Sequence, residues 1–156
     1  MDLENVEIIT NRLLLKSLSI KYKEDIFSNF TEEITTYMYP RSAKDISETE
    51  AFIKGAIQGL RDSIHLGLVI LKKESQEFLG CAGLHEINRK DPELGIWLKK
   101  EAHGNKYGLE VIIALKSWAD EKLEYEYLHY PVDKANIASR KIPEALGGEI
   151  IDRKSV

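Results

Sequence analysis

Apolar and polar positions alternate with two different periods along this chain, and the two periods predict strands and helices in turn. Period-two stretches between turn residues indicate strands, and apolar residues three and four apart indicate helices. The predicted strands are 12–18, 65–71, 78–87, 93–98, 127–132 and one from 149; the predicted helices are 20–30, one from 47, 107–123 and a short one from 136. The predicted order is therefore β-α-α-β-β-β-α-β-α-β.

Two helices have clear core faces. Ser47 and Glu50 have the spacing of a capping box, so Ser47 is the expected N-cap of the second helix. The apolar stripes that we assign to the core are Ile53, Ala56, Ile57 and Leu60 on that helix, and Ile112, Leu115, Ala119 and Leu123 on helix 107–123.

The predicted sheet is mixed. Segments 65–71 and 78–87 form an antiparallel hairpin, whereas a strand–helix–strand unit over 93–132 requires a crossover between parallel strands. Pro131 cannot donate to a strand ladder, so strands 93–98 and 127–132 are expected to splay apart there. Such a splay leaves a wedge in which a slender acyl-carrying arm can bond to the unpaired strand edge.

A polar, glycine-containing turn joins strand 93–98 to the next helix. The turn runs from His103 through Gly104 to Gly108, and it directs backbone N–H groups and the positive end of a helix towards one place. Such a place suits a phosphate or a diphosphate. The sequence therefore predicts a phosphate-bearing cofactor.

Composition narrows the function classes. The chain is 43% apolar and 31% charged, as expected for one globular domain over 1–156. The net charge of −4 argues against nucleic acid as a partner and weakly favours a cationic one. The single cysteine, Cys81, excludes an internal disulfide and a multi-cysteine zinc site, and its apolar neighbours indicate a buried, inert thiol. No signal peptide and no membrane span is evident, so a cytoplasmic location is expected.

Four segments in order resemble a known family. They are Thr10 to Leu15, Glu93 to Leu98, His103 to Gly108, and Asn136 to Ser139 followed by Leu146 and Gly147. Together they resemble the GCN5-related N-acetyltransferases (GNAT), and within them the RimJ/RimL-like ribosomal-protein-alanine branch of bacterial type. The resemblance covers nearly the whole chain. It implies an α+β fold of three layers, with a mostly antiparallel mixed sheet, a splayed central strand pair and flanking helices.

The chain departs from the family pattern at several places. His103 replaces a usual Gln or Arg, and Lys106 replaces a usual glycine, so we expect the anion site to persist if residue 106 has ordinary helical dihedrals. Pro143 interrupts the helix from Asn136 and occupies the place of a tyrosine that many members use. The chain also ends about one hairpin early, so the family's final strand is expected to be missing. The edge left exposed must be covered, tolerated or paired with a second subunit, as in a homodimer.

The resemblance implies transfer of acetyl from acetyl-coenzyme A, without a metal, to a primary amine of a protein N-terminus or a small molecule by direct attack. Its implied catalytic residues are Glu93 as general base and Ser139 as hydrogen-bond donor to the leaving sulfur. The implied cofactor-binding residues are Trp97, Leu98, His103, Gly104, Asn105, Lys106, Tyr107, Gly108, Asn136 and Ser139. The implied acceptor-binding residues are Tyr37, Tyr39 and Arg41.

Alternatives remain open at each position. Glu93 can equally be a solvated carboxylate, with Glu86 and His85 as weaker candidates for the base. Ser139 can be a helix-surface serine, and His103 can simply close its turn. For the whole chain, the alternative is a catalytically degenerate coenzyme-A-binding or interaction module. A nucleotide-binding regulator is disfavoured because neither Gly-x-x-x-x-Gly-Lys-Ser/Thr nor Gly-x-Gly-x-x-Gly occurs.

Overall fold

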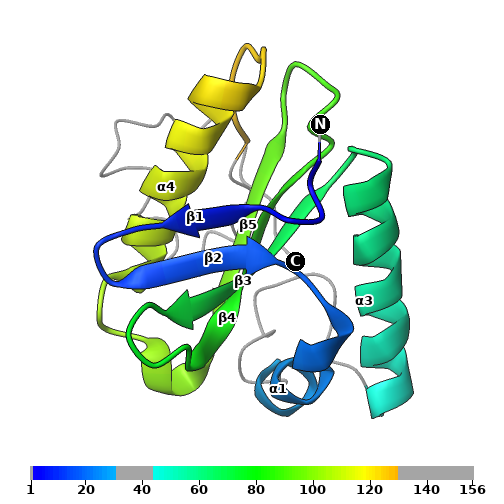
Figure 1. Cartoon of the computed structure of the whole chain (residues 1–156), viewed down its shortest axis with the longest axis vertical. Coiled ribbons are helices and arrows are strands. Elements are labelled where there is room, and N and C mark those ends of the chain that lie inside the picture. The colour runs from blue at the N-terminus through cyan, green and yellow to red at the C-terminus, as the bar shows by residue number, and fades with distance from the viewer. Residues whose placement is uncertain (1, 31–43, 130–156) are drawn as a thin grey trace.

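The computed structural model describes residues 2–30 and 44–129 (Figure 1). Five strands form one antiparallel sheet in the order β1-β2-β3-β4-β5. The strands are β1 (Glu7–Ile9), β2 (Leu13–Ser17), β3 (Leu66–Lys72), β4 (Phe78–His85) and β5 (Glu93–Leu98), and the α-helices are α1 (Lys23–Asn29), α3 (Ile46–Arg61) and α4 (Tyr107–Lys122). Short 3-10 helices η1 (Ile20–Tyr22) and η2 (Lys100–Ala102) precede α1 and the glycine-containing turn.

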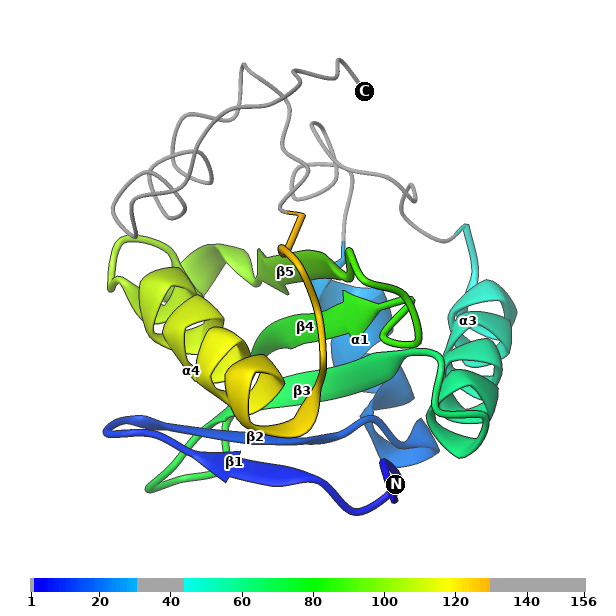
Figure 2. The ribbon, with the colours of Figure 1, turned by 90° about the horizontal axis from the view of Figure 1, so that it is seen from above.

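The helices cover the two faces of this sheet. Figure 2 shows α4 in front of the strands and α1 behind them. The α4 stripe residues Ile112, Leu115 and Ala119 are buried against one sheet face. The other face packs on Ile26 of α1 and Ile53 of α3. Both core stripes expected from the sequence are thus confirmed, and the molecule has the expected three layers.

Two details of the N-terminal half differ from the sequence expectation. β1 was not predicted; it is only three residues long, too short for a period to be read, and it pairs with β2 through Ile8 opposite Leu15. The N-cap of α3 is Asp45 rather than Ser47: one Asp45 carboxylate oxygen accepts the N–H groups of Ser47 and Glu48. A carboxylate is the better partner for the helix dipole, and it starts the helix two residues earlier than the serine would.

The second half of the described chain follows the prediction closely. β3 and β4 form the expected hairpin, β5 adds to β4, and α4 begins at Tyr107. The chain after α4 then crosses the sheet face in front of the strands and reaches β5 (Figure 2), where His129 forms a parallel bridge with Glu93. This bridge confirms the parallel neighbour predicted for β5. The expected splay at Pro131, the helix from 136 with Pro143, and the last strand lie outside the described residues.

Cys81 has the environment expected from its apolar neighbours. It lies on β4 and packs against the α1-side core, and burial raises the pKa of its thiol above the ordinary value. A thiol held in the protonated form is a poor nucleophile, so Cys81 serves packing.

Candidate functional site

The outer edge of β5 is the first component of the site. The Lys99 N–H donates to Leu79 O of β4 (2.8 Å), and the Leu94 N–H donates in the opposite direction, to His129 O (2.6 Å). Because backbone groups alternate in direction along an antiparallel strand, Ile96 and Leu98 also point their N–H groups away from β4. Within residues 2–30 and 44–129, no group accepts from either of them. Two adjacent outward donors therefore follow directly after the Glu93–His129 bridge.

The family resemblance implied Trp97 and Leu98 as the cofactor-binding residues of this strand, and the register shows which of the two points its backbone N–H outward. Trp97 faces Cys81 of β4 in the ladder, so its N–H points into the sheet. Its indole packs between Phe30 and Phe78, with ring centroids 4.8 and 5.9 Å away. Ile96 is the donor that sequence reasoning missed, since only the register with β4 shows which residues face outward.

The N-terminus of α4 is the second component. Lys106 occupies the N-cap position, and its side chain makes no capping hydrogen bond; nor does any other side chain of the described residues accept from the first turn. The N–H groups of Tyr107, Gly108 and Leu109 have no intrahelical acceptor because they belong to the first turn. α3 differs in having its first turn capped by Asp45. The end of α4 thus offers a row of free donors and a positive dipole end close to the end of β5.

The turn before α4 is held in place by its own side chains. His103 donates from Nε2 to Leu98 O (2.9 Å), which also fixes the tautomer, since a carbonyl only accepts. Asn105 donates from Nδ2 to Ala102 O (3.3 Å) and to His103 O (3.2 Å). In this structure the two side chains thus close the turn through bonds to backbone carbonyls.

Lys106 does not have the ordinary helical dihedrals that were the condition set for this substitution. Its φ of 61° and ψ of 21° lie in the left-handed region, which explains why a glycine is usual there. A non-glycine residue there costs on the order of 1–2 kcal/mol. Gly104, with φ of 83°, also turns in this region. Successive N–H groups in such a turn converge into an anion-binding hollow, so the lysine keeps the backbone path of a glycine and adds a positive charge beside it.

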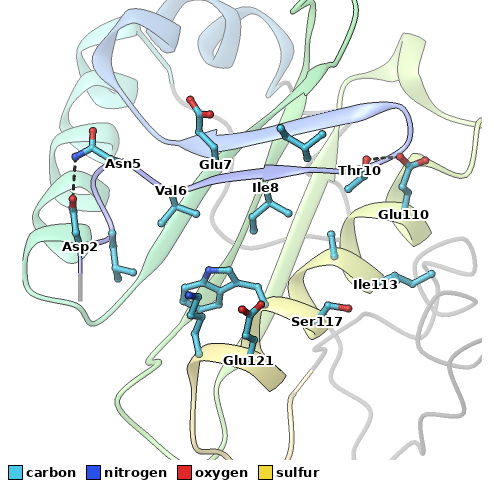
Figure 3. A pocket seen from close by; sticks show the side chains of 15 residues that line it. Asp2, Asn5, Val6, Glu7, Ile8, Thr10, Glu110, Ile113, Ser117 and Glu121 are labelled. Carbon is cyan, nitrogen blue, oxygen red and sulfur yellow. Dashed lines mark hydrogen bonds between the residues drawn. The ribbon is translucent and has the colours of Figure 1, made fainter.

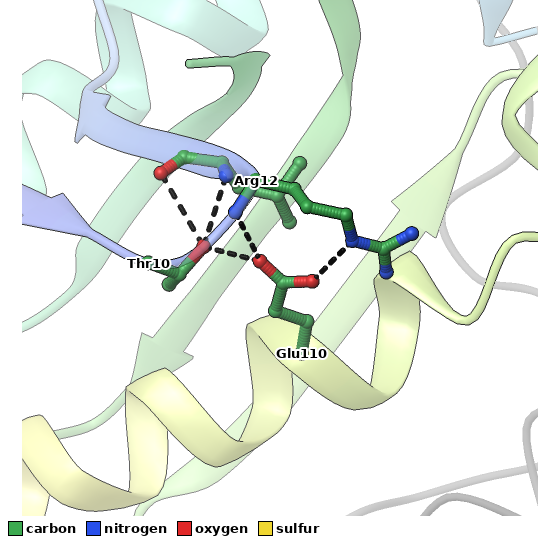
Figure 4. A network of polar contacts seen from close by, with 4 residues as sticks. Thr10, Arg12 and Glu110 are labelled. Atoms are coloured by element: carbon green, nitrogen blue, oxygen red, sulfur yellow. Dashed lines mark hydrogen bonds and ion pairs between the residues drawn. The ribbon is translucent and has the colours of Figure 1, made fainter.

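A polar clamp fixes the first turns of α4 to the β1–β2 turn (Figure 4). The Glu110 carboxylate accepts from Thr10 Oγ1, from the Arg12 N–H (2.9 Å) and from Arg12 Nε (2.7 Å). The Arg12 guanidinium also lies 4.4 Å from the centre of the Tyr107 ring. The clamp joins two of the segments that carry the family resemblance, and it sets the position of the free N–H groups of α4.

We expect Glu110→Ala to destabilise the protein by about 2–3 kcal/mol, because three donors lose a charged acceptor that is only 18% exposed. Burial alone would raise the Glu110 pKa, but the bonds from Thr10 and Arg12 outweigh it and lower the pKa below the ordinary 4.5. A lowered folded-state pKa means that this stabilisation is complete above pH 4.5 and is lost as the pH falls through the folded-state value. Urea unfolding of both proteins at pH 7 and at pH 3.5 should therefore show a smaller difference at pH 3.5.

The matched control for that experiment is Glu121→Ala, on the exposed side of the same helix. Its effect should stay within about 0.5 kcal/mol at both pH values. An equal loss for Glu110→Ala at the two pH values would contradict the carboxylate origin of the stabilisation.

Two histidines lie beside the N-terminal half of β5, on the sheet face that α1 and α3 cover. His85 is the ladder partner of Glu93, and its Nε2 lies 3.4 Å from the place where a Cβ on Gly95 would be. The His65 ring meets the His85 ring edge-on, with centroids 5.4 Å apart, and His65 Nδ1 accepts the Glu86 N–H (3.1 Å). Glu93 thus begins β5 at its bridged end, with the imidazole of His85 next to it.

Part of the predicted site lies outside the described residues. These positions are the acceptor-side residues Tyr37, Tyr39 and Arg41, and Asn136 and Ser139. The other predicted positions, from Glu93 to Gly108, are brought together along β5, the turn and the start of α4.

A groove of about 840 Å³ lies elsewhere, between β1 and α4 (Figure 3). Val6, Ile8 and Ile113 are among its apolar lining residues, and its charged lining is mainly acidic: Asp2, Glu7, Glu110 and Glu121, with Lys122. It follows β1, at the opposite edge of the sheet from β5. Its acidic lining repels a diphosphate, so we do not assign it to the cofactor.

Two other kinds of site are absent from the part of the chain that the structure describes. No group of three or more His, Cys, Asp or Glu side chains gathers there as metal ligands. No helix in that part combines the length and the apolarity needed to cross a bilayer.

Comparison with known proteins identifies the family that has this arrangement. Residues 12–149 match the family model described as the acetyltransferase (GNAT) domain. The chain belongs to the GNAT acetyltransferase family. It is accordingly an acetyl-CoA-dependent N-acetyltransferase, and the members of this family use acetyl-CoA as the acetyl donor. A search of curated proteins gave no match.

Solved GNAT structures have the same fold. A GNAT acetyltransferase from Bacillus anthracis superposes with a TM-score of 0.79 at 14% identity, over 91% of this chain and 82% of that one. RimL, the ribosomal L7/L12 α-N-protein acetyltransferase, in complex with coenzyme A, gives 0.79 at 16% identity, over 90% and 82%. The Salmonella typhimurium enzyme that modifies the N-terminal serine of L7/L12 gives 0.77 at 15% identity, over 90% and 83%. At these identities the likeness establishes the fold and leaves the acceptor open.

Proposed function

We propose that this GNAT protein transfers the acetyl group of acetyl-CoA to a primary amine at the N-terminus of a protein, by direct attack of the amine on the thioester. The observation that carries the proposal is a row of backbone donors that bond to no other group within the described residues, from Ile96 and Leu98 on β5 to the first turn of α4. An extended donor with an acyl end and a diphosphate end matches this row. Structural neighbours that modify ribosomal protein N-termini support the choice of acceptor.

In the proposed acetyl transfer, each of these groups has a separate role. The free N–H groups of the α4 first turn and Lys106 bind the diphosphate. The β5 donors hold the thioester carbonyl and stabilise the negative charge that develops on its oxygen when the amine attacks. Most of the rate gain comes from holding amine and thioester together. Glu93 and its neighbours are the proposed source of the proton acceptor, and Ser139 is the proposed donor to the leaving sulfur.

Ligand-induced stabilisation tests the cofactor part of the proposal. Coenzyme A at about 100 times its dissociation constant should add roughly 2.7 kcal/mol to the free energy of unfolding, whereas ATP and NAD should add much less. Thermal unfolding of the full chain with each ligand measures this. No stabilisation by coenzyme A would contradict the proposed site.

Turnover tests the acceptor. Acetyl-dependent release of free thiol should be faster with peptides bearing a free N-terminal amine than with the same peptides after N-terminal blocking, and faster than with small polyamines. Stabilisation by coenzyme A without turnover on any amine would favour the degenerate binding module. Faster turnover with small amines would move the acceptor to that class.

A further inference from the structure

We infer that His85 is the group that takes the proton from the acceptor amine, with His65 positioning its ring and Glu93 facing the charge that forms. The inference rests on the proposed function and assigns the proton acceptor within it. The observation is the place of the His85 imidazole, over Gly95 and next to the first free donor of β5.

Among the residues that the structure describes, one face of β5 leaves room for an amine to approach the thioester. On the α4 side, Ile96 and Leu98 pack their side chains against the core that α4 covers. On the opposite side, Gly95 has no side chain, and the nearest atom to its absent Cβ is His85 Nε2 at 3.4 Å. A carbonyl bound to the Ile96 N–H is therefore open to attack over Gly95, beneath the His85 ring.

Glu93 is less well placed for the transfer itself. It forms the parallel bridge with His129 at the closed end of β5, one step before the free donors begin. Its side chain shares a sheet face with His85, its ladder partner. From there the carboxylate interacts with the imidazolium that forms on His85.

The surroundings keep His85 neutral and able to accept. Loss of water around the ring is the main effect that lowers the His85 pKa below 6.5, and the neighbouring His65 ring lowers it further; Glu93 and Glu86 act in the opposite direction. Of the other charged groups near this cluster, Arg89 is paired with Glu86 (3.1 Å) and Asp91 (3.4 Å). At neutral pH the ring is thus an unprotonated base beside a protonated amine.

The proton balance closes without another reactant. The substrate ammonium gives one proton to His85, and the resulting amine forms the C–N bond with the thioester carbon. The C–S bond breaks, and the thiolate takes the second proton that the nitrogen loses. His85 then releases its proton to water, so the net products are the amide, coenzyme A as thiol and one proton.

The test is the pH dependence of kcat/KM in four proteins, with CoA-induced thermal stabilisation as the fold control. The wild type should show a plateau that begins near the His85 pKa and extends to the pKa of the amine. In His85→Gln the plateau should disappear, kcat/KM should rise with pH up to the amine pKa, and the value at pH 7 should fall by about 10²-fold.

Substitutions of the neighbouring residues His65 and Glu93 should move the acid limb, which is the rise of kcat/KM on the low-pH side of the plateau, in opposite directions. His65→Asn keeps an acceptor for the Glu86 N–H and removes an imidazole that disfavours a charge on His85, so the His85 pKa should rise and the limb should move to higher pH. Glu93→Gln removes a negative neighbour, so the limb should move to lower pH. NMR titration of the His85 ring in the protein without substrate should give the same two shifts, independently of turnover.

Each contrary result has one meaning. A plateau that persists in His85→Gln overturns the inference. A plateau that is abolished by Glu93→Gln while His65→Asn leaves the limb in place also overturns it, and assigns the base to Glu93. Absence of turnover by the wild type on every amine contradicts the proposed function instead.

Discussion

Gly80→Ala is expected to destabilise this protein by about 3 kcal/mol, at the upper end of what overpacking costs. A Cβ on Gly80 would lie 2.1 Å from Trp97 O and 2.9 Å from Leu98 Cα. Both are backbone atoms of β5, so no side chain can swing away to make room. The strand must move, and Leu98, the residue opposite Gly80 in the ladder, moves with it. Thermal unfolding should show a midpoint lowered by roughly 6–12 °C.

Gly55→Ala is the matched control for Gly80→Ala. Gly55 lies in α3 with nothing within 4 Å of its absent Cβ, so the same added methyl group should stabilise the protein by about 0.5–1 kcal/mol through helix propensity. Opposite signs for the two variants are the expected result. A Gly80→Ala protein as stable as the wild type would contradict the close approach of β4 and β5.

The sequence predicted those elements whose side-chain pattern is long enough to have a period. The stripes of α3 and α4 and the hairpin of β3 and β4 belong to this group, and all were found where expected. The parallel neighbour of β5 was predicted from the strand–helix–strand order, and the Glu93–His129 bridge confirms it. In these elements the burial of one face decides the structure, and a buried face requires apolar residues at a regular spacing that the sequence shows.

Features that depend on backbone geometry were not predictable in the same way. The left-handed Lys106 has no side-chain signal, because only the path of the turn requires those dihedrals. The exchange of Ile96 for Trp97 as the outward donor depends on the register with β4, which a single sequence does not contain. A one-residue shift in register reverses the direction of every backbone N–H group. The sequence could therefore place the outward donors on strand 93–98, but not on particular residues of that strand.

The place of His85 could not be predicted from the sequence either, because it depends on where the side chain lies in the fold. The sequence offered three candidates for the base, Glu93, Glu86 and His85, without a way to rank their distances to β5. The structure places the His85 ring over Gly95 and leaves Glu93 at the bridged end. Gly95 itself was visible in the sequence, but its meaning depends on which ring lies above it.

Ile96→Pro is expected to lower kcat by about 10²–10³-fold while the fold is retained, which is the loss typical of removing one donor to a developing oxyanion. The substitution deletes the Ile96 N–H, and that group points away from β4 and serves no bond within the described sheet. A proline is tolerated at a strand position whose N–H faces outward, and the preceding residue, Gly95, accepts the restricted dihedrals that a following proline imposes. KM for the donor should change much less than kcat, because the lost interaction is strongest when charge develops on the oxygen.

Two controls separate this effect from damage to the sheet. Ile96→Val keeps the N–H and most of the buried side chain, so its kcat should remain close to that of the wild type. Trp97→Pro removes an N–H that points into the ladder with β4, so it should unfold the protein rather than only inactivate it. Because neighbouring prolines then have opposite consequences for stability, circular dichroism of the two variants checks the register itself. An Ile96→Pro enzyme with wild-type kcat would show that the thioester carbonyl is held by another group, and the proposed site on β5 would be wrong at its central contact.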